Sequence, residues 1–221
     1  MAPSVDLMCH ERALIARGEI VVGLDEVGRG SLAGPLVVGA VTLRALVEPP
    51  AGLNDSKALS ARQREALVPR LRDWVDSWSL GWVSPAEIDE WGLSLALSVA
   101  ATRAIDGLSH PPSFALIDGP HNFLRAPRDV AFGVVAPATP YAALAHATLV
   151  KGDSASASIA AASVLAKVHR DQFMRELHAK CPWYAWEANK GYGSAAHLAA
   201  LRERGPSIHH RRSWKLPNKG H

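Results

Sequence analysis

The 221-residue sequence contains only two cysteines, Cys9 and Cys181. Two cysteines cannot build a disulfide framework, and free thiols are typical of a reducing compartment. Long hydrophobic runs are also lacking, because the longest stretch of small apolar residues, SIAAASVLA, is far shorter than the roughly 20 residues that cross a bilayer. The N-terminus carries charges where a signal peptide needs an apolar core. We therefore expect a cytoplasmic protein without a membrane partner.

Several motifs of well-known enzyme classes are missing. The sequence has neither a G-x-x-x-x-G-K-[ST] phosphate loop nor a G-x-S-x-G nucleophile elbow. No set of cysteines and histidines has zinc-ligand spacing. The adjacent His209 and His210 are more typical of packed or solvated side chains than of metal ligands. These absences argue against P-loop, serine-hydrolase and zinc chemistry.

Charge of one sign is not in large excess, since the formal net charge is +3. The positive charge gathers near the C-terminus, where Glu203 is the one acid among six basic residues. Such a tail suits a polyanionic partner, and a solvated terminal segment is an equally good interpretation. The basic residues of this tail are Arg202, Arg204, Arg211, Arg212, Lys215 and Lys219.

Hydrophobic residues make up 48% and charged residues 20% of the chain, which suits one folded domain. Apolar runs and turn residues predict strands at 18–26, 34–43, 77–83, 111–118 and 146–153, the first two antiparallel. Helices are predicted at 59–74, 85–106, 154–180 and 194–205, with a capping box at Ser60 and Gln63, Pro85 at a helix start and Gly205 near a helix end. Residues 121–145 stay unassigned. The pattern indicates an α/β fold, a mixed sheet with helices packed on it.

Three of these strands end in carboxylates: Asp25 with Glu26, then Asp118, then Asp153. If the strand ends meet at one edge of the sheet, two such charges about 4 Å apart repel by roughly 4 kcal/mol at an effective dielectric near 20. A divalent cation removes this penalty, and ligands that are all oxygens suit Mg²⁺ or Mn²⁺.

Each acid also has a structural interpretation. Asp118 precedes Gly-Pro and is a common turn residue, and Asp153 is a plausible helix N-cap. The Asp25–Glu26 pair is harder to explain in this way, because capping needs only one acid. Adjacent strand residues point to opposite faces. We therefore expect the strand to break or twist at Glu26, where Gly28 makes this possible.

Six segments together resemble ribonuclease HII, the type 2 ribonuclease H. They are GLDEVGRGSLAGPLVVGAV, LNDSKALS, LIDGP, VKGDSASASIAAASVLAKVHRD, NKGYGS and HHRRSW, in the family's order over most of residues 20–214. The resemblance implies a ribonuclease H-like fold: a mixed sheet flanked by helices, with a catalytic core at about 20–180 and a C-terminal helical, basic extension at about 181–221. Serine in GYGS, where threonine is frequent, and a long 121–145 section depart from the family pattern.

The resemblance implies a four-carboxylate metal site of Asp25, Glu26, Asp118 and Asp153, with Asp171 of HRD as a competitor for the fourth place. Asp171 lies inside a long helical pattern, where a salt bridge or a packed surface is the expected role. Such a site implies a two-metal mechanism without a side-chain nucleophile, which leaves a 3′-hydroxyl and a 5′-phosphate.

The resemblance also explains the Gly-Arg-Gly run. Glycines let the main chain approach a ribose 2′-hydroxyl, and Gly28, Arg29 and Gly30 are expected to test for it beside the metals, aided by Tyr192 at the RNA–DNA junction. An ordinary tight turn and a packed aromatic are the structural alternatives. Phosphate contacts are expected from Asn54, Ser56 and Lys57, with weaker candidates at Lys151, Ser154, Ser163, Lys167 and Lys190, so that binding depends on salt and not on base sequence.

The expected function is endonucleolytic cleavage of RNA in RNA/DNA hybrids and at single ribonucleotides in duplex DNA. A junction resolvase would share the acids but leaves Gly-Arg-Gly and Tyr192 unexplained, and a non-catalytic nucleic-acid binder would tolerate loss of an acid. The type 3 enzyme would carry an extra N-terminal domain, for which about 20 residues leave no room. We expect a monomer, and no motif supports a sliding clamp as partner of the tail.

Overall fold

The computed structural model describes residues 6–54, 56–126, 137 and 139–217. Its sheet has five strands in the order β3-β2-β1-β4-β5. β1 pairs antiparallel with β2 and parallel with β4; β2–β3 is antiparallel and β4–β5 is parallel. The predicted mixed sheet is therefore confirmed. The strands are β1 (Val21–Val27), β2 (Leu36–Leu43), β3 (Ser77–Val83), β4 (Phe114–Asp118) and β5 (Ala145–Leu149).

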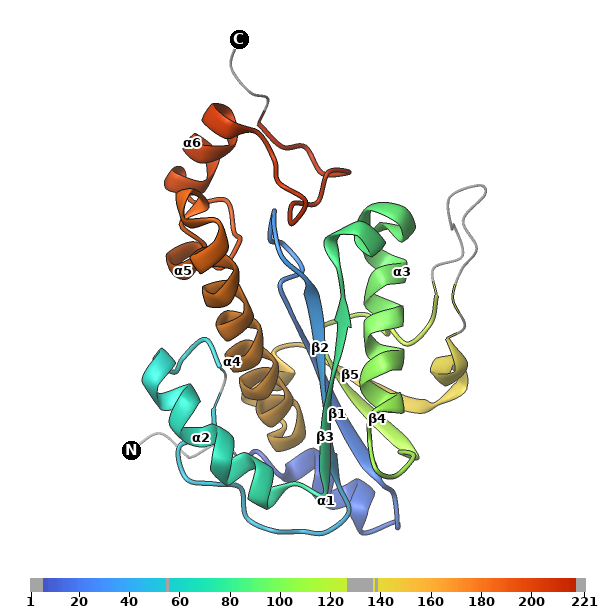
Figure 1. Ribbon diagram of the computed structural model, residues 1–221. Coiled ribbons are helices and arrows are strands. Elements are labelled where there is room, and N and C mark those ends of the chain that lie inside the picture. Colours follow the sequence, from blue (N-terminus) through green and yellow to red (C-terminus); the bar gives the residue numbers. More distant parts are fainter. Residues whose placement is uncertain (1–5, 55, 127–136, 138, 218–221) are drawn as a thin grey trace.

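Helices cover both faces of this sheet (Figure 1). α3 packs on one face around Val22 and Leu24, and α2 and α4 pack on the other around Val41 and Leu43. The helices are α1 (Cys9–Ile15), α2 (Ala61–Trp74), α3 (Pro85–Asp106), α4 (Ala157–Lys180), α5 (Trp186–Asn189) and α6 (Ala195–Arg204). Short 3₁₀ turns are η1 (Pro140–Ala143), η2 (Gly152–Ser154) and η3 (Pro182–Tyr184). No helix in the described ranges is long and apolar enough to span a membrane.

The local signals at the helix ends act as predicted. Ser60 and Gln63 form the expected reciprocal capping box at the start of α2, and α3 starts at Pro85 as expected, where Ser84 and Glu87 form a second capping box that was not predicted. Gly205 is the C-cap of α6. Cys9 and Cys181 are both free thiols. The capping residues at these helix ends confirm the predicted helix boundaries to within a few residues.

Small residues bring α4 directly onto the sheet. A Cβ added at Gly23 of β1 would lie 2.3 Å from the carbonyl carbon of Ser158, and one at Gly39 of β2 would lie 2.5 Å from the Ala162 oxygen. Neither strand position could carry a side chain without moving the helix. The close approach places the middle of α4, including Ser163, beside the end of β1.

One predicted boundary is wrong. The strand predicted at 146–153 ends at Leu149, because its neighbour β4 ends opposite, at Asp118, and offers no further backbone partner. The chain then turns at Lys151, which has a left-handed φ of 58°. Asp153 therefore lies in η2 and not at a strand end. It is not the helix N-cap either, since Ser156 caps α4.

The N-terminal helix α1 was not predicted from the sequence. Its Glu11 is fully buried and accepts hydrogen bonds from the backbone N–H of Ser158 at 2.9 Å and from the Ser158 hydroxyl at 2.7 Å. A carboxylate at the first turn of a helix also interacts favourably with the helix dipole. Glu11 thus fixes the N-terminal end of α4 from a distant part of the chain.

The C-terminal part forms the predicted helical extension. α5, α6 and η3 pack against the second half of α4 through a separate hydrophobic cluster that includes Met174, Trp186 and Leu201. Ala33, from the turn between β1 and β2, belongs to the same cluster. The segment after α6 returns to that turn, where Ala33 and His210 form a β-bridge (Figure 1). Within the unassigned 121–145 section, residues 127–136 and 138 lie outside the described residues, and the remainder includes η1 and the start of β5.

Candidate active site

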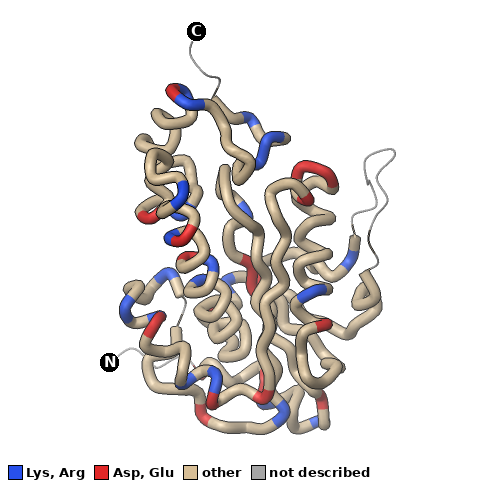
Figure 2. Tube along the Cα trace, in the orientation of Figure 1, with Lys and Arg blue, Asp and Glu red and all other residues tan. Residues whose placement is uncertain are grey.

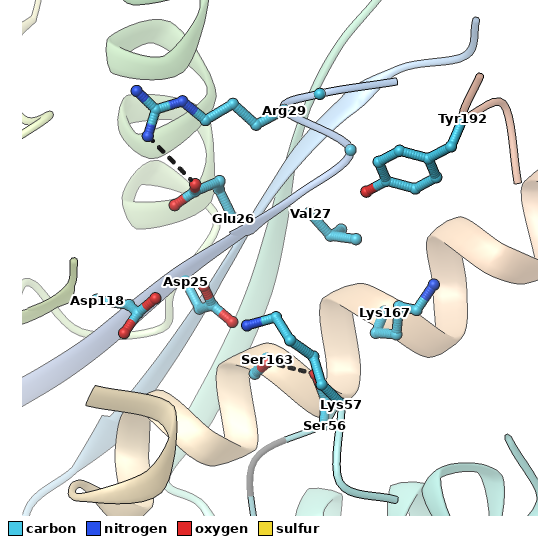
Figure 3. Close-up of a pocket in the computed structure, with 12 residues that line it drawn as sticks. Asp25, Glu26, Val27, Arg29, Ser56, Lys57, Asp118, Ser163, Lys167 and Tyr192 are labelled. Atoms are coloured by element: carbon cyan, nitrogen blue, oxygen red, sulfur yellow. Dashed lines mark hydrogen bonds and ion pairs between the residues drawn. The ribbon is translucent and has the colours of Figure 1, made fainter. Parts of the chain in front are cut away.

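A pocket of about 390 Å³ opens at the end of β1, where the chain enters the Gly-Arg-Gly turn. Side chains from β1, β4, α4, the loop before α2 and the turn before α6 meet there (Figure 3). Its lining combines acids, cations and bare backbone: Asp25, Glu26, Val27, Gly28, Arg29, Gly30, Ser56, Lys57, Asp118, Ser163, Lys167 and Tyr192. The structure thus brings together three of the four expected carboxylates.

Asp25 and Glu26 reach one pocket without a break in the strand, so the break considered at Glu26 does not occur. β1 continues to Val27, so the two side chains alternate across the sheet as strand residues do. The parallel pairing with β4 ends at Leu24 and Ile117. Beyond that point one edge of β1 is uncovered, and the pocket reaches around it to both faces. Both acids therefore line the same space.

The carboxylate of Asp25 is 5% exposed. Burial, together with the negative charges of Asp118 and Glu26, raises its pKa from 3.8 to about 8, although a hydrogen bond from Ser163 and the positive charge of Lys57 oppose the shift. Burial also raises the pKa of Glu26, against the pull of Arg29, whose Nη1 lies 3.6 Å from Glu26 Oε1. The cluster therefore lacks enough positive charge to keep every acid ionised near neutral pH.

Asp118 ends β4 and has a structural bond as well as a place in the pocket. Its Oδ1 accepts a hydrogen bond of 2.7 Å from the backbone N–H of Gly152 in η2. The second oxygen, Oδ2, takes no part in that bond. The turn role and the site role considered from the sequence are therefore compatible at this residue.

The donors in the pocket are of the kind that Mg²⁺ and Mn²⁺ prefer, since the acids supply oxygen and the lining contains no thiol or imidazole. Across the described ranges, no three acidic, histidine or cysteine side chains are placed so that they could share one ion as they stand. The residues fit a hard divalent cation by their chemistry and by their uncompensated charge.

Asp153 and Asp171, the two candidates for the fourth carboxylate, lie outside the pocket lining. Asp153 is buried, and its Oδ2 lies 3.0 Å from Nζ of Lys57, which does line the pocket. Asp171 is also buried and forms the predicted salt bridge, to Lys167 Nζ at 2.7 Å, one turn away on α4. Each of the two acids therefore reaches the pocket through a lysine.

The loop before α2 delivers Ser56 and Lys57 to the pocket but leaves Asn54 out of the lining. Ser56 is buried, and its hydroxyl is 2.7 Å from that of Ser163, which also bonds to Asp25. Hydroxyl groups thus connect this loop to Asp25 (Figure 3). Of the weaker phosphate candidates, Ser163 and Lys167 line the pocket and Lys151, Ser154 and Lys190 do not.

The glycines of the Gly-Arg-Gly turn differ in what the fold demands of them. Gly28 has a φ of +84°, and a Cβ there would lie 2.2 Å from Arg170 Nε, so the fold requires glycine. Gly30 has no positive φ, and an added Cβ would meet nothing within 4 Å. The fold leaves the missing side chain at Gly30 unexplained.

Two buried arginines hold this turn: Arg170, which was not predicted to have a role, and Arg211, which was assigned to the basic tail. Arg170 of α4 donates to the Pro35 oxygen at 2.9 Å, to Ser31 Oγ at 2.9 Å and to the Lys190 oxygen at 3.0 Å. Arg211 donates to the Gly28 oxygen at 2.6 Å and to the Arg29 oxygen at 2.8 Å. Both interpretations of the basic tail are therefore wrong for Arg211, which is fully buried within the protein. No local pattern around Arg211 indicates this burial, and only the resemblance of HHRRSW to the family set the segment apart.

Tyr192 forms another wall of the pocket and projects toward Val27 (Figure 3). Its ring is 38% exposed, and the Arg170 guanidinium carbon lies 5.7 Å from the ring centre. Its backbone oxygen accepts a hydrogen bond of 2.9 Å from Nδ1 of His197. The backbone of Tyr192 is thus fixed by His197, while its side chain stays exposed at the pocket.

The histidines behind Tyr192 form one neutral network. Because His197 Nδ1 donates to a carbonyl, its Nε2 is an acceptor for the Trp186 indole N–H at 3.2 Å and for His210 Nε2 at 3.0 Å. His210 Nδ1 then accepts from the backbone N–H of Ser207 at 2.9 Å. Burial lowers the pKa of both histidines, that of His210 to about 4. His210 is therefore packed, one of the two roles expected from the sequence.

Charge around the pocket is arranged for a polyanion. Figure 2 shows acidic residues at the middle of the sheet, with lysines and arginines on α4 and on the C-terminal segment. In the lining itself, Arg29, Lys57 and Lys167 surround the three acids. A phosphodiester held by such cations would lie against the carboxylates, where metal ions would bind.

A family model described as Ribonuclease HII matches residues 22–217. The chain belongs to the ribonuclease HII family. The Streptomyces griseus ribonuclease HII is 46% identical over 209 residues, which cover 92% of this chain and 81% of that protein. The Jannaschia sp. ribonuclease HII is 46% identical over 197 residues, 89% of this chain and 90% of that protein. The family consists of endonucleases that degrade RNA in RNA/DNA hybrids, and this chain is a ribonuclease H enzyme.

Solved structures agree with the fold. Ribonuclease H2 from Pyrococcus horikoshii superposes with a TM-score of 0.65 at 26% identity, over 88% of this chain and 93% of that one. The RNase HII of Archaeoglobus fulgidus, solved in complex with PCNA, gives 0.65 at 25% identity, over 91% and 98%. Bst-RNase HIII, solved with Mn²⁺, shares the fold at 18% identity with a TM-score of 0.63, over 92% and 70%. Ribonucleases H of this kind depend on divalent metal ions.

Proposed function

We propose that this ribonuclease cuts beside ribonucleotides in two settings: the RNA strand of RNA/DNA hybrids, and single ribonucleotides embedded in duplex DNA. Cleavage on the 5′ side of the ribonucleotide would leave a 3′-hydroxyl and a 5′-phosphate. One observation carries the proposal: carboxylates, a glycine with open space at its α-carbon and a half-exposed tyrosine line the same pocket.

Gly30 is the most informative residue of this group. A methyl group at this position would strain neither the backbone nor a neighbour, so stability gives no reason for glycine. A ligand that approaches the main chain does give one. The 2′-hydroxyl of ribose can both donate and accept hydrogen bonds, and it is the group by which a protein distinguishes RNA from DNA.

Asp25, Glu26 and Asp118 would hold the divalent ions, Mg²⁺ or Mn²⁺, with Asp153 as the proposed fourth carboxylate. When bound, such ions lower the pKa of a water and stabilise the leaving 3′-oxygen. The chain contributes the orientation: Ser163 bonds to Asp25, and the backbone of η2 bonds to Asp118. Burial of Asp25 excludes bulk water from the carboxylates and strengthens their interaction with a cation.

Arg29, Lys57 and Lys167 would contact backbone phosphates around the scissile bond. Contacts to phosphate position a duplex without reading its bases, and their strength falls as salt rises because the release of counterions on binding becomes less favourable. Tyr192 would pack on the sugar at the RNA–DNA junction, opposite the Gly-Arg-Gly turn. Binding is then independent of sequence, whereas cleavage depends on one hydroxyl group.

The test is incubation of the purified protein with an end-labelled DNA duplex that contains one ribonucleotide. Cleavage 5′ to that residue with Mg²⁺ or Mn²⁺, and none with chelator or with an all-DNA duplex, is the expected result. The Gly30→Ala variant should unfold within about 2 °C of the wild type, because the added methyl meets nothing. It should nevertheless cut the ribonucleotide-containing duplex about 10²-fold more slowly.

Two results would overturn the proposal. An intact ribonucleotide-containing duplex in the presence of either metal would remove the claimed activity, and cleavage of branched DNA instead would favour a junction resolvase. Full activity in Gly30→Ala would show that the open α-carbon has no part in ribose recognition.

A further inference from the structure

Arg211 has an unusual environment for a charged residue. Its side chain is fully buried, and it forms no ion pair with a carboxylate in the part of the chain that the structure describes. Its partners are backbone oxygens: Gly28 at 2.6 Å, Arg29 at 2.8 Å and Gly34 at 3.2 Å. Buried carbonyls need donors, and this turn has no regular strand partner to supply them.

The two bonds to Gly28 and Arg29 fix successive peptide planes. In a trans peptide the carbonyl oxygen and the following N–H point in opposite directions. With the Gly28 and Arg29 oxygens directed at the guanidinium inside the protein, the N–H groups of Arg29 and Gly30 are directed away from it. Neither N–H donates to another described group, and both residues line the pocket.

We propose that Arg211 is a positioning residue for ribose recognition: it aims the backbone N–H groups of Arg29 and Gly30 at the 2′-oxygen of the ribonucleotide. The inference rests on the proposed function and gives the basic C-terminal segment a defined task. The fork of the guanidinium matters as well as its charge, because one group must reach both oxygens at once.

The same segment also supports the opposite wall of the pocket. His210 donates to His197 at 3.0 Å, and His197 donates to the Tyr192 oxygen at 2.9 Å. Neighbouring residues of one segment therefore hold the Gly-Arg-Gly turn and Tyr192. Arg211 is the residue of this segment that contacts the Gly-Arg-Gly turn directly, so Arg211 is the residue to substitute.

The experiment combines a variant with a change in the substrate. Single-turnover rates are measured for wild type, Arg211→Gln and Arg211→Lys on duplexes that carry one ribonucleotide or one 2′-fluoro nucleotide, whose fluorine is a poor hydrogen-bond acceptor. Arg212→Gln is the matched control, because this exposed neighbour loses the same charge while its backbone N–H keeps its 2.8 Å bond to Asp89.

We expect wild type to cut the ribonucleotide much faster than the 2′-fluoro nucleotide. In Arg211→Gln the ribonucleotide rate should fall about 10²-fold, and the ratio of the two rates should fall at least about tenfold, because misaimed N–H groups no longer distinguish the substituents. Arg211→Lys should show a smaller loss of the same kind, and Arg212→Gln should keep the wild-type ratio.

A merely structural role predicts a different outcome, since a less stable enzyme loses both rates by the same factor and keeps the ratio. An unchanged ratio in Arg211→Gln, or failure of both Arg211 variants to fold at 25 °C, overturns the positioning role. If wild type leaves the ribonucleotide-containing duplex intact, the proposed function falls first. If wild type cuts it and the ratio does not move in the variants, only the role of Arg211 falls.

Discussion

The ammonium of Lys57 lies 3.0 Å from Asp153 Oδ2, joining the loop before α2 to the turn before α4. The aspartate side chain is 4% exposed and the lysine side chain is 76% exposed. A buried carboxylate thus holds a flexible cation at the pocket, where Lys57 also opposes the raised pKa of Asp25. Asp153 can serve the site through this lysine as well as through a metal ion.

A double-mutant cycle separates these roles. Asp153→Asn and Lys57→Gln should each weaken duplex binding by about tenfold, the scale of one hydrogen bond to a charged group. The double variant should be little worse than either single change, because both remove the same contact. Binding measured at fixed salt provides the test, with exposed Lys180→Gln as control for lost charge. If Asp153 is a metal ligand, its variant alone should need more Mg²⁺ for half-maximal cleavage.

Asp25→Asn should nearly abolish cleavage and leave duplex binding within about threefold, because the amide keeps the shape of the carboxylate but is a poor ligand for Mg²⁺. Thermal unfolding without metal should occur at the wild-type temperature or above it, since burial disfavours the charged form that the change removes. Asp73→Asn, on the exposed face of α2, should alter neither property. Retained turnover in Asp25→Asn would refute the metal role of this residue.

The elements that the sequence predicted are those with local signals. The capping box at Ser60, the helix start at Pro85 and the apolar strand segments depend on neighbours in the chain, and the elements they predict formed within a few residues of the expected bounds, apart from the end of β5. The end of β5 did not follow from local pattern, because it depends on where β4, its pairing partner, stops. The convergence of Asp25 and Glu26 on one pocket also depends on β4, because β4 stops pairing with β1 at Leu24 and leaves the following edge of β1 uncovered.

The residues that support the site could not be predicted from local sequence pattern, because their contacts join distant parts of the chain. Glu11 reaches Ser158 across 147 positions, and Arg211 reaches Gly28 across 183. Nothing near Glu11 or Arg211 in the sequence indicates these contacts, which exist only once the sheet and α4 have assembled. The resemblance to ribonuclease HII led to the residues expected to face the substrate and gave no account of what holds them.

Tyr192→Ala should impair cleavage at an isolated ribonucleotide about tenfold more than in a continuous hybrid, because the ring is proposed to contact the sugar at the junction only. Loss of an aromatic platform costs about 1–3 kcal/mol per contact, which supports a change of this size. Tyr192→Phe keeps the ring, and with it the contact to Arg170 at 5.7 Å, so it should retain most activity. Competition between the two substrates in one tube measures the ratio directly. Equal losses on both would contradict a junction-sensing role.

Acid should weaken the fold through His210. Its pKa is lowered to about 4 by burial and by the nearby His197, His209 and Arg212, whereas the unfolded chain takes up this proton near pH 6.5. Between those values the unfolded state binds more protons than the folded state. The free energy of unfolding therefore decreases as the pH is lowered from about 6.5 to about 4, by up to about 3 kcal/mol. Urea unfolding of His210→Gln at pH 7, 6 and 5 should show a flatter pH dependence than wild type, while exposed His110→Gln should match wild type. Equal slopes for His210→Gln and wild type would mean that the buried histidine network is not the acid-sensitive element.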